Sequence, residues 1–410
     1  MRVLHLTTEF PWPATSGGSV RTVSQLRILA SLPEIEQVTV LSVTEQAVSE
    51  SDRRALAEAI PKLRVAPPVF HPVHLFDFKS YVPRVVALRA LAGVPYLAAK
   101  WDSRALRSAL HHALIDSAVD VVYVDHLGMA RYLPDVAAGR ASCRIVLDQH
   151  NVESDFFKQF ADKQTGPKRL VAQAEYRASV RFEKNALRRA DAVVAISAED
   201  AKHFDALAGI HAHVVPLVLP FERKPRPRPA RPNLCYVGNL RWHPNVAGLD
   251  WFCREVWPKI RARVPDATFE IAGVGLKPDA SGALPVPAAW QVPGVTTVGF
   301  LEDLEPLYVR SLAMLAPVFG GSGVRVKMLE GFRAGMPVVT TPDGAFGLPL
   351  EDGQEALVAG DPERFAECVE RLLANEDVRQ RVREGGYRYL ERHHSLAVAQ
   401  GVMRRVLGLT

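Results

Sequence analysis

The sequence predicts an α/β protein built from two Rossmann-like domains that face each other across a cleft. Three observations lead to this prediction. The chain has 410 residues, which is long for a single hydrophobic core. Apolar runs of strand length alternate with amphipathic helical stretches, the pattern of a parallel sheet covered on both faces. This alternation stops at a stretch rich in proline and arginine and then begins again.

The first half of the chain carries the first series of alternating elements, and we expect it to form one domain over residues 1–221. An amphipathic helix is expected at 19–32, directly after the first strand, and longer helices at 103–118 and 168–190. Buried strands are predicted at 3–6, 38–43, 119–124, 144–148 and 191–197.

The stretch ERKPRPRPARP at 222–232 is interpreted as an interdomain linker, because alternating prolines prevent helix formation and favour an extended connector. An exposed loop within one domain is the alternative. The second domain is expected over 233–389, followed by a segment of helical pattern at 390–410. Its predicted strands lie at 233–240, 268–275, 295–300, 312–317 and 337–341, and its predicted helices at 244–264, 327–335 and 362–375.

Composition and charge narrow the classes of function. Hydrophobic residues make up 48% and charged residues 23% of the chain, as in a globular protein, and the net charge of +5 suits anionic partners. No dense basic run interleaved with aromatics predicts a nucleic-acid partner. Four scattered cysteines form no CxxC pair, so neither a zinc site nor a redox motif is indicated. With no signal peptide and no apolar stretch of membrane-spanning length in the sequence, we expect a cytoplasmic protein.

Two glycine-rich loops precede predicted helices. Gly17 and Gly18 follow the first strand and would let backbone N–H groups approach an anion, with Arg21 expected in the first helical turn. A plain surface turn is the alternative. The loop GGSGVRVK at 320–327 adds two full positive charges, Arg325 and Lys327, to the positive end of a helix. This second loop is a place for a diphosphate.

Glu330 follows that loop within two turns, where its carboxylate can accept two hydrogen bonds from a ribose cis-diol. An N-capped helix with solvated charges is the alternative. Tryptophans at 12 and 242 could stack on a sugar or a base, although packing is the simpler interpretation. The mixed basic and apolar segment 70–101 could form an acceptor or peripheral membrane surface, with ordinary helices over the core as the alternative.

The second half resembles the retaining glycosyltransferases of family 4, often called glycosyl transferase group 1, which have the GT-B fold. The resemblance covers most of residues 233–390 and is carried by CYVGNLRWHPNVAGLDWF, FEIAGVG, VTTVGFLEDLEPLY, APVFGGSGVRVKMLEGFRAGMPVVTT and DGQEALVAGDPERFAECVERLLAN. In the first half it is looser, resting on the Gly17-Gly18 loop, on DQHNVESDFF and on RADAVVAISAED. In this fold the C-terminal tail crosses back to the first domain, which binds the acceptor.

The resemblance implies roles for matched residues. Glu330 matches the second glutamate of the family's E-x7-E signature, which binds the nucleotide ribose. His150 matches the histidine that contacts the donor sugar. The backbone amides of the 323–325 turn would hold the donor diphosphate, and the Gly17-Gly18 loop would close over it.

The sequence departs from the family pattern at two places. Ser322 stands where the first glutamate of E-x7-E is expected, and Asn239 stands where the usual arginine follows the first strand of the second domain. Arg325 and Lys327, with Arg241, are the candidates to replace the missing charge, which makes the chain resemble a variant with a GxRxK-type loop. The donor-binding candidates are Gly17, Gly18, Arg241, Ser322, Gly323, Val324 and Glu330.

His150, Arg325 and Lys327 are the candidate catalytic residues. His126 follows another strand and competes with His150 for the same role, and Asp125 and Asp148 are expected to orient these imidazoles. No two aspartates stand two residues apart, so we expect no metal site and no cofactor. Arg325, Lys327 and the helix amides would stabilise the departing diphosphate by fixed electrostatics.

The expected activity is transfer of a sugar, with retention of configuration, from a nucleotide-diphosphate sugar to a glycan or lipid-linked acceptor in glycan, polysaccharide or glycolipid synthesis. A sugar-nucleotide epimerase of similar architecture and a catalytically degenerate binding protein are the alternatives. An NAD(P)-dependent oxidoreductase is disfavoured because no GxGxxG follows the first strand. The nucleotide, the sugar and the acceptor cannot be read from the sequence.

Overall fold

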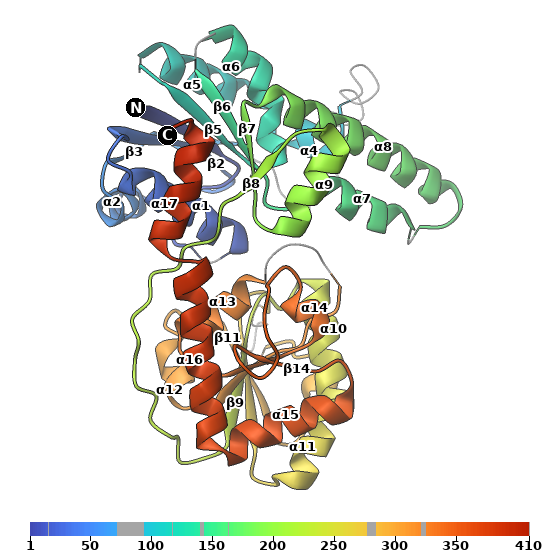
Figure 1. Cartoon of the computed structure of the whole chain (residues 1–410). Helices are drawn as coiled ribbons and strands as arrows, with labels where there is room; N and C mark the ends of the chain where they lie inside the picture. Colours follow the sequence, from blue (N-terminus) through green and yellow to red (C-terminus); the bar gives the residue numbers. More distant parts are fainter. Residues whose placement is uncertain are drawn as a thin grey trace. The chain divides into compact units, whose positions relative to one another are not determined.

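The computed structural model describes residues 1–14, 16–71, 94–116, 118–139, 143–162, 164–276, 284–320 and 325–409. The chain forms two compact units, Met1–Val218 with Leu396–Thr410, and Leu219–Ser395. Each unit is a parallel sheet with helices on both faces, as predicted (Figure 1). Most of segment 70–101 lies outside the described residues. Among the described residues no helix is both long and apolar enough to cross a membrane.

The sheet of the first unit has the strand order β3-β2-β1-β5-β6-β7-β8, with β4 paired to β2. Its neighbouring strands run parallel, so their carboxyl ends meet at one edge. Because β5 lies between β1 and β6, the loops after these three strands are adjacent. The strands are β1 (Arg2–Thr7), β2 (Gln37–Thr44), β3 (Leu63–Val65), β4 (Val69–Phe70), β5 (Val121–Asp125), β6 (Arg144–Asp148), β7 (Ala192–Ala195) and β8 (Ala212–Val214).

Helices cover both faces of this sheet because successive side chains of a buried strand point to opposite sides. On β1, Leu4 and Leu6 belong to one apolar cluster, whereas Val3 belongs to another, which α1 and α17 cover (Figure 1). The helical elements are α1 (Gly17–Ser31), α2 (Glu50–Ala59), α4 (Tyr96–Lys100), α5 (Arg104–Asp116), the 3₁₀ segment Leu127–Tyr132, α6 (Leu133–Gly139), α7 (Glu153–Asp162), α8 (Gly166–Arg189), α9 (Ala198–Ala208) and α17 (Leu396–Leu407).

The second unit has a six-stranded parallel sheet in the order β11-β10-β9-β12-β13-β14. Its strands are β9 (Asn233–Val237), β10 (Thr268–Ala272), β11 (Val295–Gly299), β12 (Ala313–Ala316), β13 (Val338–Thr340) and β14 (Leu357–Val358). Its helices are α10 (His243–Trp251), α11 (Trp257–Arg263), α12 (Glu305–Val309), α13 (Val326–Arg333), α14 (Pro342–Ala345), α15 (Pro362–Ala374) and α16 (Glu376–His393).

The single helix predicted over 244–264 is divided in the structure. A π-helical turn at Phe252–Val256 separates α10 from α11. Pro258 follows this turn and has no N–H, so the regular i→i−4 hydrogen bond to Arg254 cannot form. The helical pattern at 390–409 is likewise interrupted, because α16 ends at His393 and α17 begins at Leu396. In the first unit α17 packs against α1, where Gln400 Nε2 donates to Ser31 Oγ at 2.9 Å.

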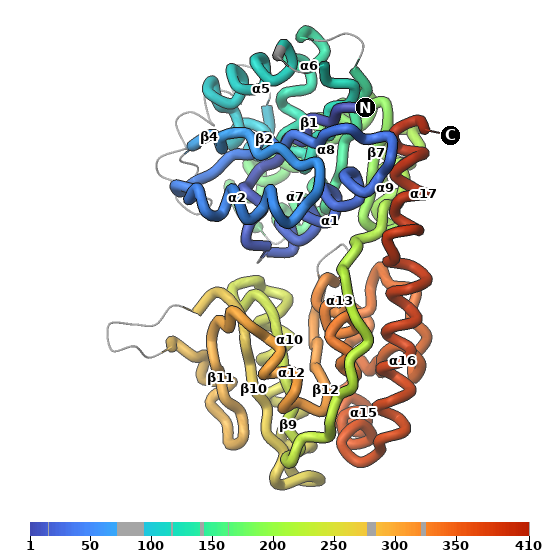
Figure 2. The backbone as a smooth tube through the Cα atoms, turned by 90° about the vertical axis from the view of Figure 1, so that its left-hand side faces the viewer, coloured from blue at the N-terminus to red at the C-terminus, as the bar shows by residue number. Residues whose placement is uncertain are grey.

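The segment predicted as a linker is extended and belongs to the second unit, where it runs beside α16 (Figure 2). Arg226 pairs with Glu305 at 2.6 Å and also donates to the carbonyl of Ala334. Arg223 pairs with two glutamates of α16, at 2.7 Å and 2.9 Å. These contacts fasten the segment to its own unit, so it differs from a free spacer.

Two buried glutamates of α8 cap neighbouring helices. Glu183 accepts hydrogen bonds from the backbone N–H groups of Glu153 and Ser154 at the start of α7, at 3.1 Å and 3.3 Å. Glu175 accepts from the N–H of Tyr96 at the start of α4, at 2.6 Å. Free N–H groups at a helix start require such partners when they are buried. Burial raises the pKa of Glu183 to about 7.

Glu183 should make the stability of the fold depend on pH. Its folded pKa of about 7 lies above the ordinary 4.5, so its contribution is complete below pH 4.5 and is lost as the pH rises through 7. The shift corresponds to about 3 kcal/mol. Glu183→Gln cannot ionise, so the loss of Tm between pH 5 and pH 8 should be smaller than in the wild type. Glu199→Gln, at an exposed position of α9, is the control, and equal pH slopes in all three proteins would contradict the assignment.

Candidate active site

Three adjacent strands of the first unit end in polar side chains. Asp125 is the last residue of β5, and His126 follows it directly. His150 comes two residues after the end of β6, and Glu9 two residues after the end of β1. Because β1, β5 and β6 are neighbours in a parallel sheet, these loops open at the same edge, where open α/β folds bind ligands. The structure therefore brings both competing histidines to one place.

The carboxylate of Asp125 joins the two histidines. Its Oδ1 lies 3.1 Å from His126 Nδ1 and 2.5 Å from His150 Nε2, and its Oδ2 accepts a hydrogen bond from Thr22 Oγ1 at 2.6 Å. The two imidazole rings lie 3.7 Å apart between centroids. His126 has a φ of 75°, a conformation that non-glycine residues rarely adopt. Asp125 thus fixes the position of both rings.

The two imidazoles differ in protonation. Burial would raise the pKa of Asp125, but His150 and His126 hold it well below its usual range. Burial lowers the pKa of His126, yet the charge of Asp125 overrides this and raises it to about 9. For His150 burial dominates, and the neighbouring His126 adds to it, so its pKa is lowered. At neutral pH the cluster therefore holds one cationic and one neutral imidazole.

Gly17 and Gly18 form the first turn of α1 next to this cluster. Ser16 caps the helix, with its Oγ accepting from the N–H of Ser19 at 2.9 Å. A Cβ at Gly18 would lie 2.9 Å from Glu9 Oε1 and 3.6 Å from His126 Nε2, so the backbone can approach these groups only without a side chain. The predicted glycine loop and His126 thus occupy the same corner of the first unit.

The carboxylate of Asp148 binds groups other than the two imidazoles, so of the two predicted aspartates it is Asp125 whose side chain orients the rings. The backbone carbonyl of Asp148 accepts from the N–H of His126 at 3.0 Å. Its two carboxylate oxygens are taken by Arg21 Nη2 and by the hydroxyl of Tyr123, each at 2.8 Å. Arg21 was expected in the first turn of α1 but lies in the second, where it is buried. This ion pair fastens α1 to the carboxyl end of β6.

Two further carboxyl groups, Glu9 and Glu153, interact with His126 and were not predicted from the sequence. Burial raises the pKa of both Glu9 and Glu153, although the charge of His126 acts against it. Glu9 follows β1 and Glu153 begins α7, so their places after strand ends could have indicated them. Asp125, His126 and His150 are also a group whose ligand atoms lie within 4.8 Å of one another, close enough to surround a metal ion.

The second unit contributes the predicted cationic turn before α13. Ser322, Gly323 and Val324 lie outside the described residues. Arg325 is buried, and its guanidinium donates to the carbonyl of Gly320 at 2.8 Å and to that of Asp343 at 3.2 Å. It also lies 5.4 Å from the ring centre of Trp242. Arg325 therefore connects the start of α13 to the loop after β12 and to α14.

Lys327 is the second residue of α13, and its side chain reaches Tyr236 of β9. Its Nζ donates to the hydroxyl of Tyr236 at 2.8 Å and to Asn245 Oδ1 at 2.5 Å, and it lies 4.4 Å from the centre of the Tyr236 ring. Burial, and next the charge of Arg325, lower its pKa well below the usual range. The structure thus places two cationic groups close enough to disfavour each other's charge.

Glu330 is one turn further along α13 and partly exposed. Its Oε2 accepts from Arg333 Nε at 2.8 Å. Arg241 is exposed, and its Nε donates to the carbonyl of Gly275 at 2.7 Å. Of the predicted site residues in this unit, Lys327 and Glu330 therefore lie on α13 and Arg325 directly precedes that helix, whereas Arg241 binds a neighbouring loop.

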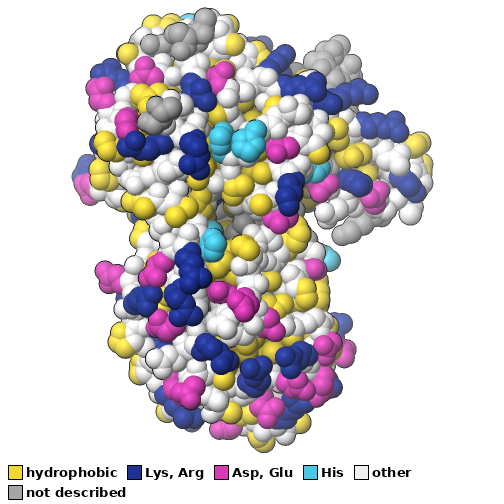
Figure 3. Space-filling model, viewed as in Figure 1, with side chains coloured by type: hydrophobic (Ala, Val, Ile, Leu, Met, Phe, Trp, Pro, Cys, Tyr) yellow, Lys and Arg dark blue, Asp and Glu magenta, His cyan; other side chains and the backbone are white. Residues whose placement is uncertain are grey.

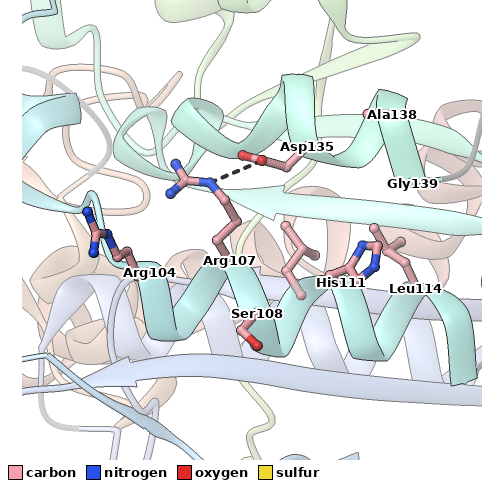
Figure 4. Close-up of a pocket in the computed structure, with 9 residues that line it drawn as sticks. Arg104, Arg107, Ser108, His111, Leu114, Asp135, Ala138 and Gly139 are labelled. Atoms are coloured by element: carbon pink, nitrogen blue, oxygen red, sulfur yellow. Dashed lines mark hydrogen bonds and ion pairs between the residues drawn. The ribbon is translucent and has the colours of Figure 1, made fainter.

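A cavity of about 470 Å³ lies elsewhere in the first unit, between α5 and α6 (Figure 4). Arg104, Arg107 and His111 line it from α5, and Arg107 Nε donates to Asp135 of α6 at 3.0 Å. None of the residues around Asp125 belongs to its lining. The cavity is therefore separate from the candidate active site.

Asp125→Asn should remove the negative charge that raises the pKa of His126. Without this charge burial acts with less opposition, so we expect the pKa of His126 to fall from about 9 by about one unit or more, which an NMR titration of the imidazole C–H signals would measure. Thr22→Val, which removes only the bond to Oδ2, is the control and should leave that pKa nearly unchanged. The ion pair stabilises the fold most below pH 6.5 and loses this effect as the pH rises through about 9. An unaltered His126 titration in Asp125→Asn would overturn the assignment.

Known proteins resemble this chain both over its second unit and over nearly its whole length. Residues 231–375 match the family described as Glycosyl transferases group 1. Over 378 residues the chain is 22% identical to an uncharacterised 44.6 kDa protein in the cps region of Klebsiella pneumoniae, with 90% of each chain covered.

Two solved structures are similar over the whole length. One is HepE of Anabaena in complex with UDP and glucose, with 13% identity, a TM-score of 0.65 and 100% of both chains covered. The other is a variant of TarM from S. aureus in complex with fondaparinux, alpha-GlcNAc-glycerol and UDP, with 9% identity, a TM-score of 0.69, and 99% of this chain and 100% of that chain covered. At such identities the likeness establishes the fold. The chain has the two-domain GT-B fold, and its residues 231–375 match the glycosyl transferases group 1 family.

Proposed function

We propose that the chain is a cytoplasmic glycosyltransferase that moves a sugar, with retention of configuration and without a metal ion, from a nucleotide-diphosphate sugar to a glycan or lipid-linked acceptor. The observation that carries the proposal is the cationic start of α13, with Arg325 and Lys327 followed by Glu330, inside the group 1 domain. UDP, which is bound in the similar HepE and TarM structures, is the first nucleotide to test.

The charge arrangement at α13 favours a diphosphate. Burial and the neighbouring Arg325 lower the pKa of Lys327, and an anion beside both groups would reverse this effect. The start of a helix adds the equivalent of about half a positive charge. In this proposal the amides of Gly323 and Val324, together with the Ser322 loop, hold the diphosphate. Fixed cations then stabilise the negative charge that develops on the leaving group, the task that a metal ion performs in other transferases.

The imidazole pair of the first unit is the second set of groups to which we assign a role in the reaction. We assign contact with the donor sugar to His150, because it is the neutral imidazole of the pair and can both accept and donate a hydrogen bond. His126 is the cationic partner and stabilises negative charge near the first turn of α1, where Gly17 and Gly18 lie. Asp125 positions both rings.

Glu330→Ala tests the donor site directly. Loss of the ribose contacts should weaken UDP binding at least about tenfold, because a hydrogen bond to a charged group contributes about 1.5–3 kcal/mol. Titration calorimetry, after thermal-shift screening of UDP, GDP and ADP sugars, would measure the loss. Arg333→Ala breaks the same ion pair but keeps the carboxylate, so it is the matched control and should bind normally. Normal UDP affinity in a folded Glu330→Ala protein would refute the ribose role.

His150→Ala and His126→Ala should separate the two histidines. The first should lose most turnover while keeping nucleotide affinity, since its contact is with the sugar. The second should lower turnover less, because in this proposal His126 stabilises charge and does not contact the donor sugar. Turnover should survive EDTA. If His126→Ala is the more damaging change, the two roles are exchanged; a loss of activity in EDTA would instead assign a metal to the group formed by Asp125 and the histidines.

A further inference from the structure

The hairpin formed by α7 and the first part of α8, residues 153–181, has an exposed apolar surface that no packing explains. We call it the α7–α8 arm. Phe156 and Phe160 are 60% and 51% exposed on α7, and Leu170 and Val171 are 69% and 68% exposed on α8. Phe156 and Phe160 are one helical turn apart, so they share a side of α7. None of the four belongs to an apolar cluster of the first unit.

The same arm is strongly basic at its surface. Five basic side chains are exposed along it. Among the described acids of that span Asp162 is exposed and Asp155 is partly exposed. The five basic residues are Lys158, Lys168, Arg169, Arg177 and Arg181. The acids that α8 itself carries, Glu175 and Glu183, are buried as helix caps, so they do not neutralise the surface. Figure 3 shows Lys and Arg side chains interspersed with apolar ones over this arm.

The arm presents these groups away from the sheet. α8 has 24 residues and is therefore about 36 Å long. Figure 1 shows its first half, with α7 alongside, reaching past the strands of the first unit. Leu170, Arg177 and Arg181 are spaced by 7 and 4 residues, so they follow one side of the helix. The arm thus joins an apolar tip to a basic side.

We propose that the α7–α8 arm is a lipid-binding surface that holds the protein on a bilayer with anionic headgroups. Apolar side chains at the tip would enter the boundary between headgroups and acyl chains, and the basic side chains would contact the phosphates. A second copy of the chain fits less well, because two such arms would bring like charges together. This inference concerns a surface apart from the residues around Asp125 and does not depend on sugar transfer.

Co-sedimentation of the full chain with vesicles tests the surface. The chain should bind vesicles of phosphatidylcholine mixed with phosphatidylglycerol and not vesicles of phosphatidylcholine alone. The double changes Phe156→Ser with Phe160→Ser, and Arg177→Glu with Arg181→Glu, should each lower binding to the mixed vesicles about tenfold or more. Matched controls are Ile115→Ser, an equally exposed apolar residue of α5, and Arg388→Glu with Arg392→Glu, an exposed pair of the same spacing on α16.

Each other outcome counts against the proposal. Absence of binding to the mixed vesicles would reject a lipid surface, and equal binding by arm and control variants would place lipid contact elsewhere on the chain. If light scattering shows a dimer that the arm variants abolish, the arm is a self-association surface. Thermal unfolding of every variant establishes that it is folded, as expected for changes at exposed positions.

Discussion

The pairing of the buried Asp125 carboxylate with His126 and His150 determines the protonation of both histidines. A charge without solvent is costly unless it is paired, and here two imidazoles and the hydroxyl of Thr22 share it. The sharing is unequal, because one carboxylate cannot hold two adjacent cations at neutral pH. One ring therefore carries a proton at physiological pH and the other does not. A single acidic side chain thereby produces two histidines with different chemical properties.

The second unit also holds charged groups away from solvent, but here they are two neighbouring cations. Arg325 and Lys327 are held close together. Arg325 donates to the backbone carbonyl of Gly320, and Lys327 donates to a hydroxyl and to an amide oxygen. A neutral oxygen of this kind orients a cation without cancelling its charge. Because burial and the nearby charge of Arg325 both act on Lys327, its pKa is lowered well below the usual range. A bound anion beside both groups would raise the pKa of Lys327 again, and these two residues lie within the stretch that matches glycosyl transferases group 1.

The two buried glutamates of α8 cap neighbouring helices and also affect the charge of the exposed side of α8. Glu175 and Glu183 lie two turns apart on one side of the helix and are used to cap α4 and α7. Because these acids face inward, the outer side of the helix is left with bases. The capping bonds therefore fix the start of α7, which follows His150 in the chain. They also leave the solvent-exposed side of the arm with a net positive charge.

The alternation of apolar runs and helical stretches was sufficient to predict two parallel sheets, since that pattern depends on neighbouring residues along the chain. The glycine pairs, the cationic turn at 325–327 and both histidines could be recognised for the same reason. What the sequence could not predict was the choice of partners. Asp125 and Asp148 each end a strand, and only the position of β5 between β1 and β6 puts Asp125 against both imidazoles while Arg21 takes Asp148. That choice depends on strand order and on contacts between residues more than a hundred positions apart, which a local pattern does not encode.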